Sequence, residues 1–109
     1  MTDKELLSNA ARALLERGLT LDHPDSWAPL AYDGDAFRLS VSLSIGIVYY
    51  PSLGDGGLVG VGHNLGLTIS EPYAGDARAA TRRALVRAAA ALASVNGQSA
   101  PDGLDRTFD

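Results

Sequence analysis

Residues 37–50 read FRLSVSLSIGIVYY and carry the clearest pattern in this chain. The seven odd positions are all apolar, whereas the first five even positions are arginine, serine or glycine. Successive side chains of a β-strand point to opposite faces, so this alternation predicts a half-buried strand with its odd positions in the core. The even positions turn apolar only at Val48 and Tyr50. The serines are then expected on the exposed or helix-covered face of a sheet.

The first half of this stretch also fits a second structure. Fourteen residues are long for one strand, so Gly46 is expected to mark a bulge, a bend or a break. Three of four positions at helical spacing are apolar, and Asp35 could serve as an N-cap, which allows a helix over residues 36–43. Alternation fits more positions and suits the valine and isoleucine content. The sequence therefore predicts a strand over residues 37–43 and leaves a helix as the alternative.

The glycine-rich middle of the chain indicates two further strands. PSLGDGG, residues 51–57, is a cluster of turn residues. Strands are predicted at residues 58–62 and 66–70. Gly60 and Gly62 would leave one of these strands a thin face, against which a bulky group could pack.

Two long helices are predicted at the two ends of the chain. Thr2 and Glu5 have the spacing of a capping box, and apolar residues then recur at helical spacing, so we expect a helix over residues 3–17 that ends at Gly18.

The C-terminal helix is expected to run from Ala77 to about Val95. Asp76 can cap its start, and Asn96 and Gly97 form a C-terminal stop signal. The face of this helix is mostly alanine, so its backbone can approach a sheet closely.

The composition is that of one small globular domain. The chain has 109 residues, of which 46% are hydrophobic and 20% charged, and its formal net charge is −4. We expect a single domain over residues 1–97 and a disordered tail over residues 98–109. Cysteine is absent, which excludes disulfides and fits a reducing cytoplasm. No apolar run approaches the roughly 20 residues that span a bilayer, so a cytoplasmic protein without a membrane partner is expected.

No residue pattern predicts a catalytic or metal site. The glycine run lacks the lysine and the following helix of a phosphate-binding loop. His23 and His63 lack the spacing of metal ligands, and Asp33 and Asp35 flank Gly34 as turn residues do. We therefore expect no catalytic activity, no metal and no cofactor.

Arginine is the one functional residue type that is concentrated in the sequence. The C-terminal helix carries four arginines, and the sequence has no acidic residue between Ala77 and Pro101. They form either a solvated helix face that pairs with the acidic segment 22–35, or a surface for phosphate or an acidic partner. The candidate interaction surface consists of Arg78, Arg82, Arg83 and Arg87.

Two segments together resemble small phage- and prophage-encoded proteins of the phage alpha-beta-alpha sandwich type. They are WAPLAYDGDAFRLSVSL, residues 27–43, and YAGDARAATRRALVRAAAALA, residues 73–93. In that family the segment that matches residues 40–44 is more helical in character. The resemblance implies an alpha-beta sandwich and a phage-related setting. It brings no established activity and no catalytic residues.

The predicted order helix, three strands, helix also resembles double-stranded-RNA-binding domains, whose last helix carries basic residues at its start. Only Arg78 lies near that start here, and the protein is acidic. Nucleic-acid binding is therefore kept as the alternative function.

Taken together, these patterns predict an α+β domain with the element order α-β-β-β-α. An antiparallel sheet of about three strands should pack against both long helices, and the odd positions of residues 37–49 should meet the alanine face of residues 77–95. The expected function is that of an uncharacterised, phage-related accessory or protein-interaction domain with an unknown protein partner. The alternative is a weak nucleic-acid-binding module that uses the arginine-bearing helix. The sequence leaves the oligomeric state open.

Overall fold

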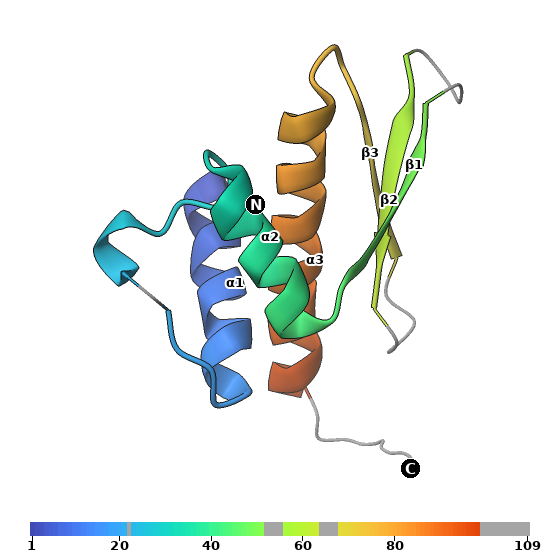
Figure 1. Ribbon diagram of the computed structural model, residues 1–109. Helices are drawn as coiled ribbons and strands as arrows, with labels where there is room; N and C mark the ends of the chain where they lie inside the picture. The colour runs from blue at the N-terminus through green and yellow to red at the C-terminus, as the bar shows by residue number, and fades with distance from the viewer. Residues whose placement is uncertain (22, 52–55, 64–67, 99–109) are drawn as a thin grey trace.

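The computed structural model describes residues 1–21, 23–51, 56–63 and 68–98 and has an α+β fold with a three-stranded antiparallel sheet (Figure 1). The predicted fold class is confirmed, with one helix added. The elements in chain order are α1 (Asp3–Glu16), the short 3-10 helix η1 (Pro24–Ser26), α2 (Asp33–Leu43), β1 (Gly46–Tyr50), β2 (Leu58–Gly62), β3 (Thr68–Pro72) and α3 (Ala77–Gln98).

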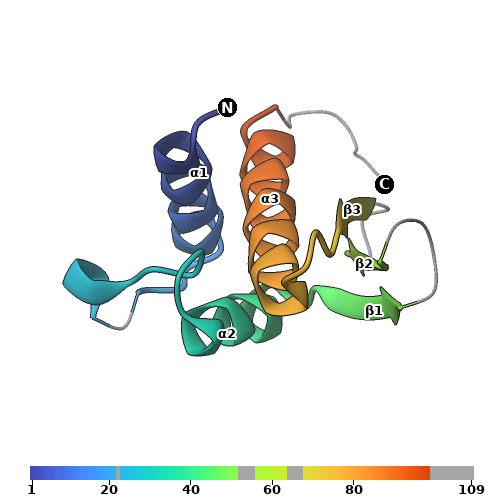
Figure 2. The same ribbon diagram turned by 90° about the horizontal axis from the view of Figure 1, so that it is seen from above.

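Helix α3 is the centre of the molecule. Seen from above, the sheet lies on one side of α3 and α1 on the other, while α2 crosses beside α3 near β1 (Figure 2). We expected both long helices on the sheet, but within the described residues it is α3 that lies against β2 and β3, and α1 packs on the far side of α3.

The burial of α3 follows from this central position. Its side chains are buried in several directions, because the sheet, α1 and α2 all surround it. Alanine at most of these positions lets the neighbouring backbones come close. The buried residues of α3 are Ala80, Ala84, Leu85, Val86, Ala88, Ala89, Ala90, Leu92 and Ala93.

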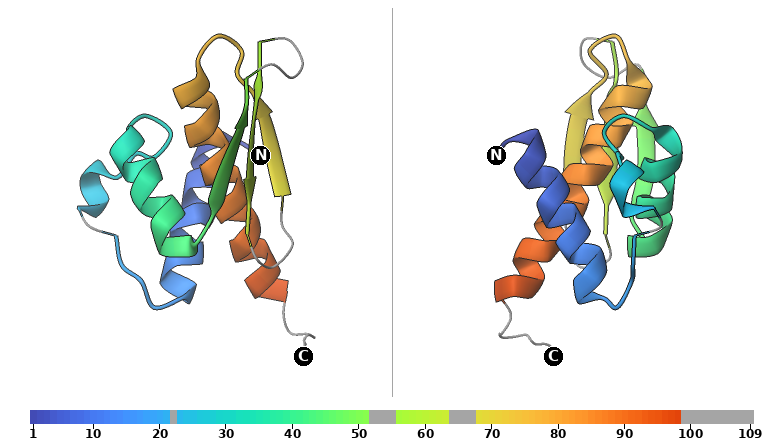
Figure 3. Two further views of the ribbon diagram at one scale, coloured as in Figure 1. Left: turned by 45° about the vertical axis from the view of Figure 1, so that its right-hand side comes forward. Right: turned by 90° about the vertical axis from the view of Figure 1, so that its left-hand side faces the viewer.

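The sheet has the strand order β1-β2-β3, and both pairs are antiparallel. Val48 of β1 and Ser70 of β3 are both in register with Gly60 of β2, one on each side. Val59 and Val61 of β2 are buried on the face that meets α3. The two glycines of β2 therefore lie on the opposite face, which the described elements leave uncovered (Figure 3).

The prediction of a strand over residues 37–43 is wrong, and the helical alternative is confirmed. Helix α2 ends at Leu43, and its C-cap Ser44 has a left-handed φ of 57°. Leu39 and Leu43 are apolar in both the twofold and the helical pattern, so the alternation that favoured a strand did not exclude the helix. Contact with α3 decides, because it buries one helical face, which consists of Ala36, Leu39, Ser40 and Leu43.

The odd positions of the same stretch do not share one environment as a result. Leu39, Leu43 and Ile45 are buried in the core, whereas Phe37 and Val41 are exposed on α2. The Ser40 hydroxyl is buried and donates a hydrogen bond of 2.8 Å to the Ile45 carbonyl. Gly46, expected to mark a break, is the first residue of β1.

The predicted helix starts are confirmed in detail. The Thr2 hydroxyl accepts from the Glu5 amide, and the Glu5 carboxylate accepts from the Thr2 amide, which forms the capping box of α1. The Asp76 carboxylate accepts from the Ala79 amide at the start of α3.

The expected end of the last helix is wrong, because α3 continues through Asn96 and Gly97 to Gln98. Of the predicted tail, Gln98 belongs to α3, and residues 99–109 lie outside the described residues. The strand predicted at residues 58–62 is confirmed as β2. The next strand is β3, which spans Thr68–Pro72, and residues 64–67 lie outside the described part of the chain.

Candidate functional site

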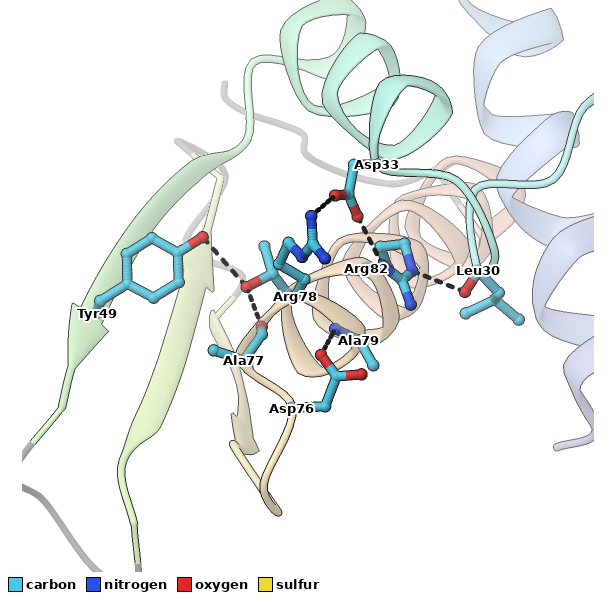
Figure 4. A network of polar contacts seen from close by, with 9 residues as sticks. Leu30, Asp33, Tyr49, Asp76, Ala77, Arg78, Ala79 and Arg82 are labelled. Atoms are coloured by element: carbon cyan, nitrogen blue, oxygen red, sulfur yellow. Dashed lines mark hydrogen bonds and ion pairs between the residues drawn. The ribbon is translucent and has the colours of Figure 1, made fainter.

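The arginines of α3 are engaged with other elements of the same chain. Arg78 and Arg82 both reach Asp33 at the start of α2, with nitrogen–oxygen distances of 3.3 and 2.6 Å (Figure 4). The Arg82 Nε also donates to the Leu30 carbonyl over 2.9 Å. The side chain of Arg82 is only 18% exposed, whereas that of Arg78 is 83% exposed. Arg82 is thus held between α3 and the segment before α2.

The other two arginines point in two further directions. Arg83 pairs with Asp3 of α1 over 2.8 Å, and Arg87 pairs with Glu71 of β3. The four arginines therefore connect α3 to three neighbouring elements. The geometry favours the interpretation that they pair with acidic groups of this chain, including Asp33 from the acidic segment that the sequence had singled out.

Asp33 and Asp35 lie in the first turn of helix α2 and not in a connecting turn as the sequence predicted, and their carboxylates serve different contacts. Asp33 faces the arginines of α3, whereas the Asp35 carboxylate accepts a 2.9 Å hydrogen bond from the Ala28 amide and pairs with Arg38. The Ala28 amide is the main cause of a lowered pKa of Asp35, and Arg38 lowers it further. Their contacts give these carboxylates structural roles on both sides of the start of α2.

The two histidines lie in different surroundings, and His23 is the one near these carboxylates, because it lines a hollow together with Asp35 and Arg38 and adds to the lowering of the Asp35 pKa. His23 is exposed and caps η1 with a left-handed φ of 56°, and His63 follows β2, where burial lowers its pKa. Among the described residues, no three histidine, aspartate or glutamate side chains are grouped so that they could hold a metal ion.

An apolar surface around β1 is the feature that the candidate list from the sequence had missed. Phe37 of α2 is 65% exposed, and Val48, Tyr49 and Tyr50 of β1 are 52, 50 and 45% exposed. We call these residues, together with Ile47, the β1 surface. The sequence did contain a signal for it, because the even positions of residues 37–50 change from serine and glycine to apolar residues at Val48 and Tyr50.

A groove lies at the inner side of this surface, between α2, β1 and α3. It has a volume of about 240 Å³ and is lined mainly by hydrocarbon. Tyr49 is fixed at its wall by a hydrogen bond of 3.1 Å between its hydroxyl and that of Thr81 (Figure 4). An edge-on contact with the Tyr73 ring also holds it. The apolar lining consists of Ala36, Phe37, Ile47, Tyr49 and Leu85, and the charged rim of Asp33, Arg78 and Arg82.

The outer face of the sheet has a shallow hollow of about 350 Å³ on the other side of β1. Its floor is glycine, because Gly60 and Gly62 of β2 leave no side chains between Tyr50 and Thr68. The Tyr50 ring lies over Gly60, with its Cε2 atom 3.6 Å from the point where a Cβ would stand. Both faces of β1 are therefore apolar and exposed.

The free edge of β1 adds the backbone to this surface. One edge of β1 pairs with β2, and no strand in the described part of the chain pairs with the other. The residues of β1, GIVYY, include no charged residue and no proline. Strand edges of this kind are the ones on which other strands add, because their amide and carbonyl groups have no partner in the sheet.

Comparisons with known proteins add no relative to these observations. No family model matches the chain, and neither the curated proteins nor the solved structures include a match. Within the described residues, no helix is long and apolar enough to cross a membrane. The resemblance to phage alpha-beta-alpha sandwich proteins stays a prediction from two sequence segments.

Proposed function

We propose that this protein is a non-catalytic protein-interaction domain that binds its partner through the β1 surface. The observation that carries the proposal is the free, uncharged edge of β1 beside an apolar groove. Soluble domains usually protect such edges with charges, proline or a covering element. β1 has neither a charge nor a proline.

The mode of binding that suits this site is strand addition. A partner segment in extended conformation would pair its backbone with the edge of β1, which provides affinity for many sequences. Alternate side chains of that segment would point toward the groove and meet Phe37, Ile47 and Leu85. Selectivity would then come from apolar side chains at every second position.

Helix α2 supports this mode by its position. It lies on the β1 side of the molecule, on the same side of the sheet as α3, while β3 lies at the far edge of the sheet (Figure 3). A strand added to β1 would have α2 on one face, as β2 and β3 have α3. The exposed Phe37 would become buried in that contact.

Nucleic-acid binding by the α3 arginines is the second candidate. Arg82, Arg83 and Arg87 would have to leave Asp33, Asp3 and Glu71 before they could pair with phosphates. The net charge of −4 opposes the approach of a polyanion. The contacts therefore favour the β1 surface over the arginines.

The phage-related setting and a cytoplasmic location are parts of the same proposal. They are supported by the two sequence segments and by the absence of cysteine. The accessory role is that of a domain that recognises a protein segment.

A selection from a random peptide library tests the proposed function. Bound peptides should carry apolar residues at alternate positions and should shift the backbone NMR signals of β1 more than those of β3. Val48→Lys should weaken their binding at least tenfold, because lysine on an edge opposes strand addition. Ser70→Lys is the matched control, since Ser70 occupies the equivalent register position on β3.

Two results would contradict the proposal. Equal weakening by both lysine variants would remove β1 as the site. Salt-dependent binding of RNA or DNA, with no peptide bound at β1, would favour the second candidate instead.

A further inference from the structure

We propose that the segment bound by the β1 surface is β1 of a second copy of this chain, so that two copies form one continuous six-stranded sheet about a twofold axis. The inference rests on the proposed function and names its partner. In the pairing, residue 48 of each copy lies opposite residue 48 of the other. Gly46 lies opposite Tyr50, and Ile47 lies opposite Tyr49.

The absence of charged residues on β1 permits this pairing. A twofold axis places identical or symmetry-related residues opposite each other, so any charged residue near the axis meets its own charge. β1 is uncharged, although the protein as a whole carries a net charge of −4. The edge of β1 is thus a place where two acidic copies can meet without repulsion in the paired segment.

The backbone also fits a pairing centred on Val48. In an antiparallel pair, the residues whose amide and carbonyl groups point outward from β1 alternate along the strand. In the proposed pairing the two residue numbers of each opposite pair add to 96. An even-numbered residue therefore always lies opposite an even-numbered one, and an odd-numbered residue opposite an odd-numbered one. Outward-pointing groups of one copy consequently meet outward-pointing groups of the other.

The side chains on the outer face alternate in size across the axis. Tyr50 of one copy lies opposite Gly46 of the other, which has no side chain to compete for space. Within one copy the Tyr50 ring also lies over a glycine, Gly60, which is a diagonal neighbour because the register partner of Tyr50 is Leu58. Val48 packs against Val48 of the second copy at the centre.

The inner face brings the remaining apolar residues together. Ile47 and Tyr49 line the groove beside β1, so the residues opposite them in an added strand also point toward it. In the proposed pairing these residues are Tyr49 and Ile47 of the second copy. Each groove is then closed by the other copy, which makes the interface self-complementary.

The size of the surface sets the expected strength. Phe37, Tyr49 and Tyr50 are about half exposed, and an aromatic side chain buries 150–250 Å², so these rings supply roughly 300 Å² per copy. Stable interfaces bury about 800 Å² per partner. Val48 and the backbone edge add to the rings, and we expect a reversible dimer with a dissociation constant on the order of micromolar.

Sedimentation velocity across a concentration series tests the dimer. The wild-type protein should change from monomer to dimer between about 1 and 500 µM. Val48→Lys should raise the dissociation constant at least tenfold, because two lysines would face each other at the axis. Ser70→Lys should leave it within about twofold. Circular dichroism of both variants checks that they are folded.

A cysteine variant tests the register separately. The chain contains no cysteine, so Val48→Cys provides a single thiol. Residues directly opposite in an antiparallel pair have Cβ atoms about 4.5–5.5 Å apart, which is close to the 3.5–4.5 Å of a disulfide. Mild oxidation should convert Val48→Cys to a covalent dimer at least tenfold faster than Ser70→Cys.

The outcomes separate this inference from the proposed function. A wild-type protein that stays monomeric at all concentrations overturns the second copy as partner, while peptides selected on the β1 surface would still support the function. A dimer that Val48→Lys leaves intact also overturns the inference, because another surface then holds the copies together. Equal cross-linking of both cysteine variants overturns the register.

Discussion

The two edge strands of this sheet, β1 and β3, pair with the same central strand, yet they differ in charge and in exposed apolar residues. β3 has Pro72 at its end, and its Glu71 is tied to Arg87 of α3. β1 has no charge and no proline, and three of its five residues are large, apolar and exposed. The contrast shows that one edge is protected by residue types that oppose strand addition, whereas the other is left open to it.

The anchoring of the two edges to α3 differs in the same way. β3 is held partly by the ion pair between Arg87 and Glu71. The groove beside β1 is instead lined by apolar groups that include Leu85 of α3, with a hydrogen bond between Thr81 and Tyr49. An apolar contact loses more free energy on truncation than an exposed ion pair does. Four predictions probe this comparison, from the largest expected effect to the smallest.

Leu85→Ala should have the largest effect. Leu85 is buried and lines the groove beside β1, so truncation removes apolar contacts and leaves a cavity. We expect a loss of about 2–5 kcal/mol in the free energy of unfolding, measured by urea denaturation. A loss well under 1 kcal/mol would mean that β1 does not depend on this apolar contact.

Gly57→Ala and Gly60→Ala should change the free energy of unfolding in opposite directions, although the two positions are only three residues apart. A Cβ at Gly57 would lie 2.6 Å from the Tyr73 ring at a φ of +111°, so we expect destabilisation by about 1–3 kcal/mol. A Cβ at Gly60 would lie 3.6 Å from Tyr50, an ordinary contact, and a smaller loss of chain entropy should stabilise the protein by about 0.4–1 kcal/mol. Thermal unfolding of both variants measures the difference, and equal signs would contradict the open outer face.

Arg87→Met should weaken the protected edge only slightly. The Arg87 side chain is 41% exposed and water screens its pair with Glu71, so a loss of about 0–1 kcal/mol is expected. A double-mutant cycle with Glu71→Gln isolates the pair. A coupling energy of several kcal/mol would show that β3 depends on this ion pair as strongly as the β1 side depends on Leu85.

The smallest expected effect is a change in how stability depends on pH. It concerns Asp35 at the start of α2, the helix beside the open edge. The Ala28 amide lowers the folded-state pKa of Asp35 below its unfolded value near 3.9. The ionised carboxylate therefore contributes stability above about pH 4, and this contribution is lost as the pH falls through the lower folded-state pKa.

Asp35→Asn should lower stability at neutral pH and give a shallower acid decline than the wild type. Unfolding midpoints between about pH 2 and pH 7 measure the two slopes. Asp25→Asn, at an exposed aspartate of η1, is the matched control and should leave the wild-type slope unchanged. If Asp35→Asn kept the full acid decline, the contact with Ala28 would not contribute to folding.

Several parts of the fold could be predicted because their signals are local. The capping box at Thr2 and Glu5, the cap at Asp76 and the strand at residues 58–62 each follow from a few neighbouring residues. The end of α3 could not be predicted this way. Asn96 and Gly97 favour a stop, but the helix continues to Gln98.

The candidate site depended on contacts that sequence spacing does not contain. The four arginines were visible as a group, yet their partners Asp3, Asp33 and Glu71 come from three different elements. The apolar character of Val48 and Tyr50 was also visible. The sequence did not show that these two residues lie on an edge strand, because only the order of the strands in the sheet shows this.

The sequence by itself determined the α+β class, the helix starts, the central strand and the uncharged character of residues 46–50. The tertiary structure decided that residues 37–43 are helical, which arginine pairs with which acid, and that β1 is an edge strand of the described sheet beside a groove. The physical reason is that alternation favoured a strand over residues 37–43, although Leu39 and Leu43 also suited a helix, so the local pattern pointed to the wrong structure. Burial of the helical face of α2 against α3 decided between them.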